Sequence, residues 1–341
     1  RLSFSNQQVD LMKPSVVRES LKHLVTRQRP AFIWGPVGAG KSDIVAAVAK
    51  DLKVELRDVR LNLIDPVDLR GFPVVRGTGK SQTMAFVPPD FLPSKGKGIL
   101  FLDEMNSAPQ SVQAAAYQLI LNRKLGDYEL PEGWAVIAAG NRSSDRSVVN
   151  AQPAALANRF VHIDFEVDAE DWYAWATQNN VSDIIRAFIK FRPNLLHSFD
   201  SAANPRAFPT PRSWVFVDDV IQSGLSTDTE FELIKGTVGE GAAGEFIAFA
   251  RLARDLPTAE EILAAPTKAR VPTAPAAQYA VVTMLDKRAT GKNISALLSY
   301  VSRMPVEFQV LFMRSAAMAN RDLLSTTEYV TWITANQDVL I

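Results

Sequence analysis

The sequence predicts an α/β fold, in which helices cover both faces of a doubly wound parallel sheet, followed by an all-helical domain. Short apolar runs alternate with helical patterns up to about residue 165. A Gly-rich segment joins the first apolar run to the helix after it, and strand patterns vanish from about residue 210. Alternation of strands with helices is typical of parallel sheets, so the helical remainder is assigned to a second domain.

The first elements are a helix, a strand and a second helix. Residues 16–27 place apolar side chains at helical spacing, and the apolar run 31–34 reads as a buried strand. The helical pattern resumes over residues 43–52. The Gly-rich segment therefore lies between a strand and a helix.

One further helix and four further strands are predicted in the same part of the chain. A helix is predicted from Ser107 to Arg123, because Ser107 and Gln110 match a Ser-x-x-Gln capping box. The apolar or alternating runs predict strands over 54–61, 98–102, 134–139 and 160–165.

Two segments do not fit a minimal sheet and are predicted to be hairpin inserts, at about 65–98 and 124–133, because both carry turn residues at short spacing. We expect a nucleotide-binding domain over residues 1–205 and a helical domain over residues 206–341. Helices of the second domain are predicted over 211–223, 244–254, 276–286, 294–302, 305–319 and 326–334.

Composition excludes several kinds of protein. The 341 residues include 37 Lys and Arg and 37 Asp and Glu, so no global charge attracts nucleic acid or an anionic membrane. The chain has no Cys and three scattered His, which excludes disulfides, thiol catalysis and a zinc cluster. No apolar stretch is long enough for a membrane span and no signal-like core opens the chain, so a cytoplasmic protein is expected.

The Gly-rich segment is a complete phosphate-binding loop in the strand-to-helix setting that such loops require. Its glycines let backbone N–H groups turn toward a polyphosphate, its lysine carries a positive charge to the phosphates, and its serine offers a hydroxyl to Mg²⁺. The sequence therefore predicts a nucleoside triphosphate and Mg²⁺ as cofactors. The loop consists of Gly35, Pro36, Val37, Gly38, Ala39, Gly40, Lys41 and Ser42.

An acidic pair follows the buried run 98–102. Because Asp103 comes at the carboxyl edge of the predicted sheet, its carboxylate can hold Mg²⁺ together with Ser42. Glu104 is then placed to orient or deprotonate an attacking water, which favours hydrolysis over transfer to a metabolite. A P-loop kinase ranks last for that reason. No Asn-Lys-x-Asp guanine motif occurs, so ATP is the expected nucleotide.

Three polar residues further on are candidates for contact with the γ-phosphate. Asn141 follows the run 134–139, although an ordinary Asx turn would explain it too. Arg159 precedes the fourth strand and Arg212 opens the helical domain, and each could serve as a cationic donor in the transition state or as a surface ion-pair partner.

These motifs, in this order, resemble the AAA+ superfamily, and more closely the MoxR-type ATPases. The resemblance covers residues 8–335 and implies a RecA-like domain, a helical lid, and a ring, usually a hexamer, with ATP between subunits. By position, the resemblance assigns residues 35–42 to the Walker A motif. It also matches the two predicted hairpins to the inserts of the helix-2-insert clade. It further assigns Asp103 and Glu104 to Walker B, Asn141 to sensor 1, Arg159 to the trans arginine finger and Arg212 to sensor 2.

One departure concerns the finger. MoxR-type proteins often follow the sensor asparagine with proline, whereas Arg142 and Arg146 lie close after Asn141 here. The order of preference for the finger is Arg159, then Arg142, then Arg146.

The leading hypothesis is a chaperone-like remodelling ring that acts on a protein client, with a von Willebrand factor A (VWA) domain protein as partner, as the resemblance implies. The alternatives are a nucleic-acid motor or restriction-type translocase subunit, and a nucleotide-gated scaffold. A local basic excess over residues 76–98 favours the motor, although the neutral chain opposes it. The presence of Glu104 argues against the scaffold hypothesis, because a switch that does not hydrolyse ATP needs no catalytic carboxylate.

Overall fold

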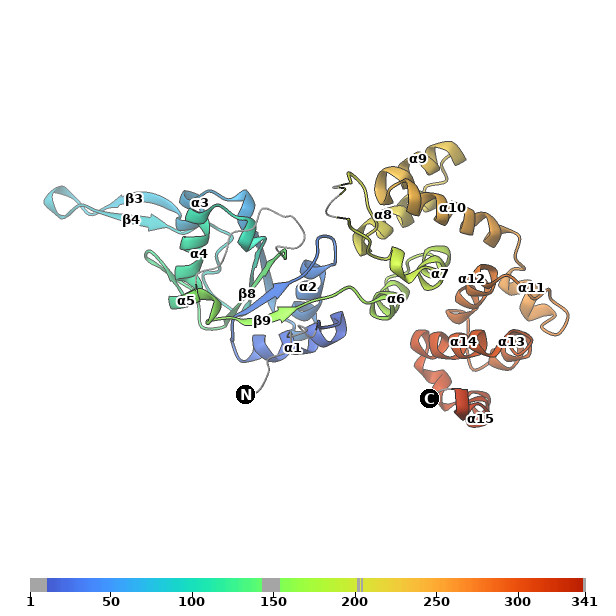
Figure 1. Cartoon of the computed structure of the whole chain (residues 1–341). Coiled ribbons are helices and arrows are strands. Elements are labelled where there is room, and N and C mark those ends of the chain that lie inside the picture. Colours follow the sequence, from blue (N-terminus) through green and yellow to red (C-terminus); the bar gives the residue numbers. More distant parts are fainter. Residues whose placement is uncertain (1–10, 143–153, 201–202, 204, 340–341) are drawn as a thin grey trace, which may run out of the picture. The chain divides into compact units, whose positions relative to one another are not determined.

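The computed structural model describes residues 11–142, 154–200, 203 and 205–339 (Figure 1). The chain divides into two compact units, Arg1–Val167 and Asp168–Ile341. The first contains the sheet and the second is helical, which confirms the predicted fold class.

The first unit is built on a five-stranded sheet whose strands all run parallel. Its strand order is β2-β5-β8-β1-β9, so the first strand lies inside the sheet between two strands that come much later in the chain. The bounds are Ala31–Trp34 for β1, Glu55–Arg60 for β2, Gly98–Asp103 for β5, Trp134–Gly140 for β8 and Val161–Asp164 for β9.

Helices cover both faces of this sheet because its central strands are apolar on both sides. Ile33 and Ile137 belong to a buried cluster with residues of α1 and α2, whereas Phe32 belongs to the opposite cluster with residues of α4. The helices that cover the sheet are α1 (Pro14–Thr26), α2 (Lys41–Leu52) and α4 (Gln110–Asn122).

The register brings the strand ends together at one edge. Trp34 pairs with Gly140, and Leu102 pairs with Ala138, so the phosphate loop, Asp103 and Asn141 all follow strands that end side by side. The sheet therefore assembles the predicted site from segments far apart in the sequence.

Both predicted inserts contain an antiparallel hairpin. The longer pairs β3 (Phe72–Arg76) with β4 (Thr83–Val87), follows the short helix α3 (Pro66–Arg70), and extends away from the sheet (Figure 1). The shorter pairs β6 (Lys124–Leu125) with β7 (Tyr128–Glu129).

The predicted capping box at Ser107 is wrong. Residues Met105–Ser107 form a 3-10 turn, and α4 starts at Gln110 after Pro109, with no side-chain cap. Proline disfavours a helical conformation in the residue before it, so Pro109 ends the turn and delays the helix.

The second unit consists of helices around its own core. Trp214 of α8 packs against Phe188 of α7 and Phe246 of α10, with ring centroids 5.2 and 5.7 Å apart. The helices are α6 (Ala169–Gln178), α7 (Asp183–Phe191), α8 (Pro211–Gln222), α9 (Thr227–Val238), α10 (Glu240–Arg254), α11 (Ala259–Ala264), α12 (Pro275–Asp286), α13 (Ile294–Val301), α14 (Val306–Ala319) and α15 (Thr327–Ala335).

The division between the units lies before residue 168, N-terminal to the boundary that we predicted after residue 205. The difference arises from α6 and α7, which the sequence patterns did not reveal and which pack on α12. Phe191 of α7 contacts Tyr279 of α12 with centroids 5.8 Å apart. None of the helices in the described ranges is long and apolar enough to cross a membrane.

Candidate active site

The phosphate-binding loop connects β1 to α2 at the carboxyl edge of the sheet. Gly38 and Gly40 have φ angles of 73° and 91°, in the left-handed region that favours glycine. The Gly35 N–H donates to the Gly140 carbonyl at 3.3 Å, so the loop is tied to the end of β8. The positive φ angles explain why the sequence has glycine at positions 38 and 40.

Lys41, the first residue of α2, lies inside the loop. Its Nζ donates to the carbonyls of Gly35 and Pro36 at 2.7 and 3.0 Å, and to Asn141 Oδ1 at 2.9 Å. The loop lysine and the asparagine after β8, predicted separately from the sequence, are thus in direct contact. A phosphate bound in the loop would lie beside both.

Ser42 and Asp103 form the second contact of the site. Ser42 Oγ donates to Asp103 Oδ2 at 2.9 Å, and Asp103 is nearly buried, with 8% of its surface exposed. The hydroxyl of α2 and the carboxylate of β5 thus converge on one point. Hard oxygen donors of this kind suit Mg²⁺, which binds through few protein ligands and completes its shell with phosphate and water.

Glu104 follows directly in a strained conformation. Its φ is 55° and its ψ 31°, which is uncommon for a residue other than glycine, asparagine or aspartate. Its N–H donates to Asp103 Oδ1 at 2.9 Å, and its Oε2 accepts from Asn62 Nδ2 at 3.5 Å. Asn62, which comes just after β2, was not predicted from the sequence, because nothing in the local pattern distinguishes it from a loop asparagine.

Asn106 is a second site residue that no sequence pattern indicates. It is 1% exposed, its Nδ2 donates to the Asn141 carbonyl at 2.7 Å, and its Oδ1 accepts the Asn141 N–H at 3.2 Å. A Cβ on Gly140 would lie 2.3 Å from that oxygen, so only glycine fits there. This reciprocal pair fixes the backbone of Asn141 against the segment that carries Asp103 and Glu104.

A family model agrees with this geometry. The model described as "ATPase family associated with various cellular activities (AAA)" matches residues 31–167, from β1 to just beyond β9. Residues 31–167 form an AAA ATPase domain. The enzyme class predicted from the phosphate loop and the acidic pair, an ATPase, is confirmed for this domain.

Individual proteins resemble the chain only distantly. Midasin of Giardia intestinalis is 27% identical over 165 residues, which are 46% of this chain but 3% of midasin's length. The RuvB Holliday junction branch migration motor of Thermotoga maritima has a TM-score of 0.39 at 16% identity, covering 69% of this chain and 67% of RuvB. NtrX of Brucella abortus in complex with ADP has a TM-score of 0.35 at 15% identity, covering 96% of this chain and 68% of NtrX. Similarities this weak carry no argument about function.

The candidate arginines differ in their surroundings. Arg142 of the AAA domain donates to the Phe165 carbonyl at 2.6 Å and lies 3.8 Å from Asp164, so its guanidinium is held within its own subunit. Arg159 is exposed, and within the described residues its guanidinium has no hydrogen bond or ion pair. Arg146 lies outside the described residues, and Arg212 is exposed on the first turn of α8 in the second unit.

A histidine links the Arg159 turn to the central sheet. The indole N–H of Trp34 donates to His162 Nδ1 at 2.9 Å, so the proton of the neutral imidazole is on Nε2 and faces the Ala157 carbonyl 2.8 Å away. Trp34 is the last residue of β1, directly before the phosphate loop. One imidazole therefore connects that strand to the turn that carries Arg159.

The electrostatics of the edge also fit a cation. Burial raises the pKa of Asp58 on β2, and the negative charge of Asp103 raises it further. A divalent ion at Asp103 would relieve this repulsion. Within the described ranges, no group of three or more His, Cys, Asp and Glu residues could hold a metal ion. The contact between Ser42 and Asp103 makes these two residues the candidate ligands.

Proposed function

We propose that this chain is a Mg²⁺-dependent, MoxR-type remodelling ATPase that assembles into a ring, usually a hexamer, and acts on a protein client. The observation that carries the proposal is the pair of contacts at the edge of the sheet. Lys41 meets Asn141, and Ser42 meets Asp103 with Glu104 next in the chain. This set supplies groups for the phosphates, the metal ion and the attacking water.

In this proposal, residues 35–42 hold the triphosphate of ATP, and Ser42 and Asp103 hold Mg²⁺, which when bound neutralises charge on the phosphates. Glu104 accepts the proton of the attacking water, and Asn62 holds the carboxylate until that water is in position. Asn141 fixes the water or the γ-phosphate from the end of β8. The absence of Cys agrees with a reducing compartment such as the cytoplasm.

Arg159 is proposed to act in the active site of the neighbouring subunit. Two facts support it over Arg142. Arg159 is exposed and its guanidinium has no partner among the described residues, whereas the guanidinium of Arg142 is engaged by Phe165 and Asp164. The charge on the phosphoryl group in the transition state is stabilised by an arginine, which a neighbouring subunit can supply. Arg212 keeps its sequence-based assignment as sensor 2.

Mixing two inactive variants tests this arrangement. Glu104→Gln subunits keep Arg159, and Arg159→Ala subunits keep Glu104, so an equal mixture is expected to restore roughly one quarter of the interfaces in a head-to-tail ring. The measurement is phosphate release after subunit exchange, compared with each variant alone. A mixture as inactive as its parts would show that Arg159 does not act across the interface.

The surface of the hairpin β3–β4 supports the proposal that the client is a protein. Its strands expose several apolar side chains, with 70% of the Val75 surface and 66% of the Met84 surface accessible, and these two residues are cross-strand partners. An exposed apolar surface of this kind favours contact with polypeptide. The resemblance to MoxR-type ATPases supports a VWA-domain partner.

The client and the nucleic-acid alternative can be separated with one variant. Replacing Val75 and Met84 together by serine is expected to leave basal ATP hydrolysis unchanged, because the hairpin lies away from the site, and to weaken binding of unfolded β-casein about tenfold. Fluorescence anisotropy of labelled casein and of labelled single-stranded DNA measures both. Binding of DNA that weakens steeply between about 50 and about 200 mM salt would instead favour the motor.

A further inference from the structure

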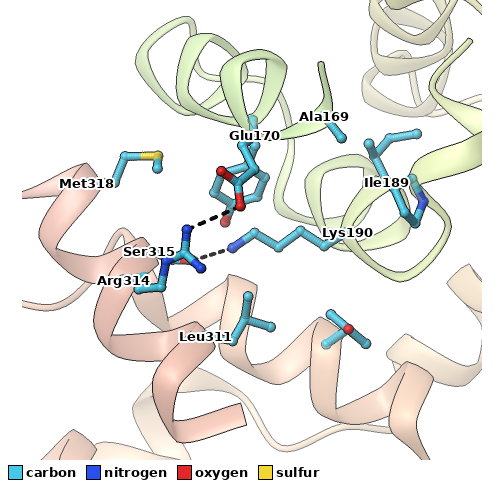
Figure 2. A pocket seen from close by; sticks show the side chains of 11 residues that line it. Ala169, Glu170, Ile189, Lys190, Leu311, Arg314, Ser315 and Met318 are labelled. Carbon is cyan, nitrogen blue, oxygen red and sulfur yellow. Dashed lines mark hydrogen bonds and ion pairs between the residues drawn. The ribbon is translucent and has the colours of Figure 1, made fainter. Parts of the chain in front are cut away.

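The second unit encloses a cavity that the proposed ATP chemistry does not use (Figure 2). Its volume is about 210 Å³, and its walls come from α6, α7, α12, α14 and the 3-10 turn after α7. Most of the walls are apolar, and the polar side chains gather on one side. The lining residues are Ala169, Glu170, Tyr173, Ile189, Lys190, Pro193, Tyr279, Leu311, Arg314, Ser315 and Met318.

Lys190 is the polar centre of this cavity. Its side chain is 12% exposed, its Nζ lies 3.5 Å from the centre of the Tyr173 ring, and it donates to Ser315 Oγ. A lysine ammonium has three N–H donors, and Ser315 is its only hydrogen-bond acceptor among the described residues. Donor capacity therefore remains at a nearly buried cation that lines an open volume.

The nearby carboxylate is already satisfied by other groups. Asp286 is fully buried and accepts from Tyr173 and from Arg186 Nη1, the latter at 3.3 Å, whereas Lys190 is 3.9 Å away, beyond hydrogen-bond distance. Arg186 also pairs with Asp183 at 2.6 Å. Because burial outweighs the attraction of Asp286, the pKa of Lys190 is lowered to about 7.

The mouth of the cavity holds one more ion pair. Arg314 of α14 donates to Glu170 of α6 at 3.2 Å, and both side chains are exposed (Figure 2). Surface pairs of this kind are weak, so Arg314 can turn toward an incoming anion at little cost. The groups that face Lys190 are thus Glu170 and Tyr173 of α6, Arg186 of α7, Asp286 of α12, and Arg314 and Ser315 of α14.

We propose that this cavity binds a small organic acid, with its carboxylate against Lys190 and its apolar body against Leu311, Met318 and Tyr279. The carboxylate would take up the donor capacity of the ammonium, and the cavity has room for a body about the size of one aromatic ring. A bound acid would contact helices on both sides of the cavity and hold α6 and α7 against α14. This inference is independent of the proposed ATPase mechanism.

Proton uptake gives the proposal a specific signature. A carboxylate beside Lys190 stabilises the ammonium, so the pKa of that group rises on binding. At about pH 8 the free protein holds most Lys190 side chains neutral, and binding should take up close to one proton per site. At about pH 6 the amine is already charged, so almost no uptake is expected.

Calorimetry with benzoate on the full chain tests this. Titrations in two buffers of different ionisation enthalpy measure proton uptake directly, and we expect saturable binding with Kd of about 1 mM or below. Neutral benzamide should bind at least about tenfold more weakly. Lys190→Gln should abolish the uptake, and Lys235→Gln, which removes a charge from α9 of the same unit, should leave it unchanged.

A second measurement does not depend on a variant that folds. In protein labelled with ¹³C-methyl methionine, benzoate should shift the Met318 methyl signal at the cavity and leave that of Met84 in the β3–β4 hairpin unchanged. Absence of saturable heat, equal binding of benzamide, or binding without proton uptake at about pH 8 would each overturn the proposal. So would unchanged uptake in a folded Lys190→Gln variant.

Discussion

Glu104→Gln is expected to stop ATP turnover while leaving ATP bound. Glutamine keeps the size of the side chain but cannot accept a proton from water, so phosphate release should fall by about 10²–10⁴-fold. The residues that contact the phosphates are unchanged, so affinity for ATP should stay within about twofold of the original chain. Phosphate release and equilibrium binding of a fluorescent ATP analogue measure the two quantities.

The matched control is Glu129→Gln on β7, a surface glutamate whose carboxylate pairs with Lys124 at 3.5 Å. It removes the same charge and should turn over ATP normally. Normal turnover in Glu104→Gln would show that Glu104 is not the base. It would also remove the argument against a nucleotide-gated scaffold, because that argument rests on Glu104 being a catalytic residue.

Lys41→Met is expected to abolish ATP binding. Methionine keeps the length of the side chain but loses the charge, and with it the hydrogen bonds to Gly35, Pro36 and Asn141. A charge-assisted contact to phosphate in a partly buried loop is worth several kcal/mol with its associated hydrogen bonds, so affinity should fall by at least about 10²-fold. Isothermal titration with ATP measures the loss.

Lys50→Met provides the comparison on the same helix. Lys50 lies in the last turn of α2 and is exposed, so this variant should bind ATP like the original chain. Thermal unfolding of both variants separates loss of binding from loss of fold. ATP affinity unchanged in a folded Lys41→Met variant would refute the assignment of the loop.

The sequence predicted the sheet because its strands are short, apolar and separated by helical patterns. The predicted strands 98–102 and 134–139 correspond to β5 and β8. Both are covered on both faces, so each appears in the sequence as a continuous apolar run that is easy to recognise. It predicted the main contacts of the site for a related reason. Residues that follow parallel strands share one edge, so Lys41, Asp103 and Asn141 could be placed together before any distance was known.

The missed features depend on contacts that local patterns do not encode. Asn62 and Asn106 matter because of which residues they face across the fold, and an asparagine in a loop gives no local sign of that. No helix was predicted where α9 lies. This helix buries only Ile234 and Val238, so the apolar periodicity of its sequence is weak. At Ser107 a good capping pattern lost to Pro109, which shows that a nearby backbone restriction can outweigh a side-chain preference.

His162 links the end of β1, which leads into the phosphate loop, to the turn that carries Arg159. The imidazole accepts from Trp34 and donates to Ala157, so two hydrogen bonds join β1 to the turn that carries Arg159. Any shift of β1 that follows emptying of the phosphate loop must carry that turn along or break one of the two hydrogen bonds. If Arg159 acts in the active site of a neighbouring subunit, the nucleotide state of one protomer would then change the position of Arg159 in the next active site through the imidazole of His162.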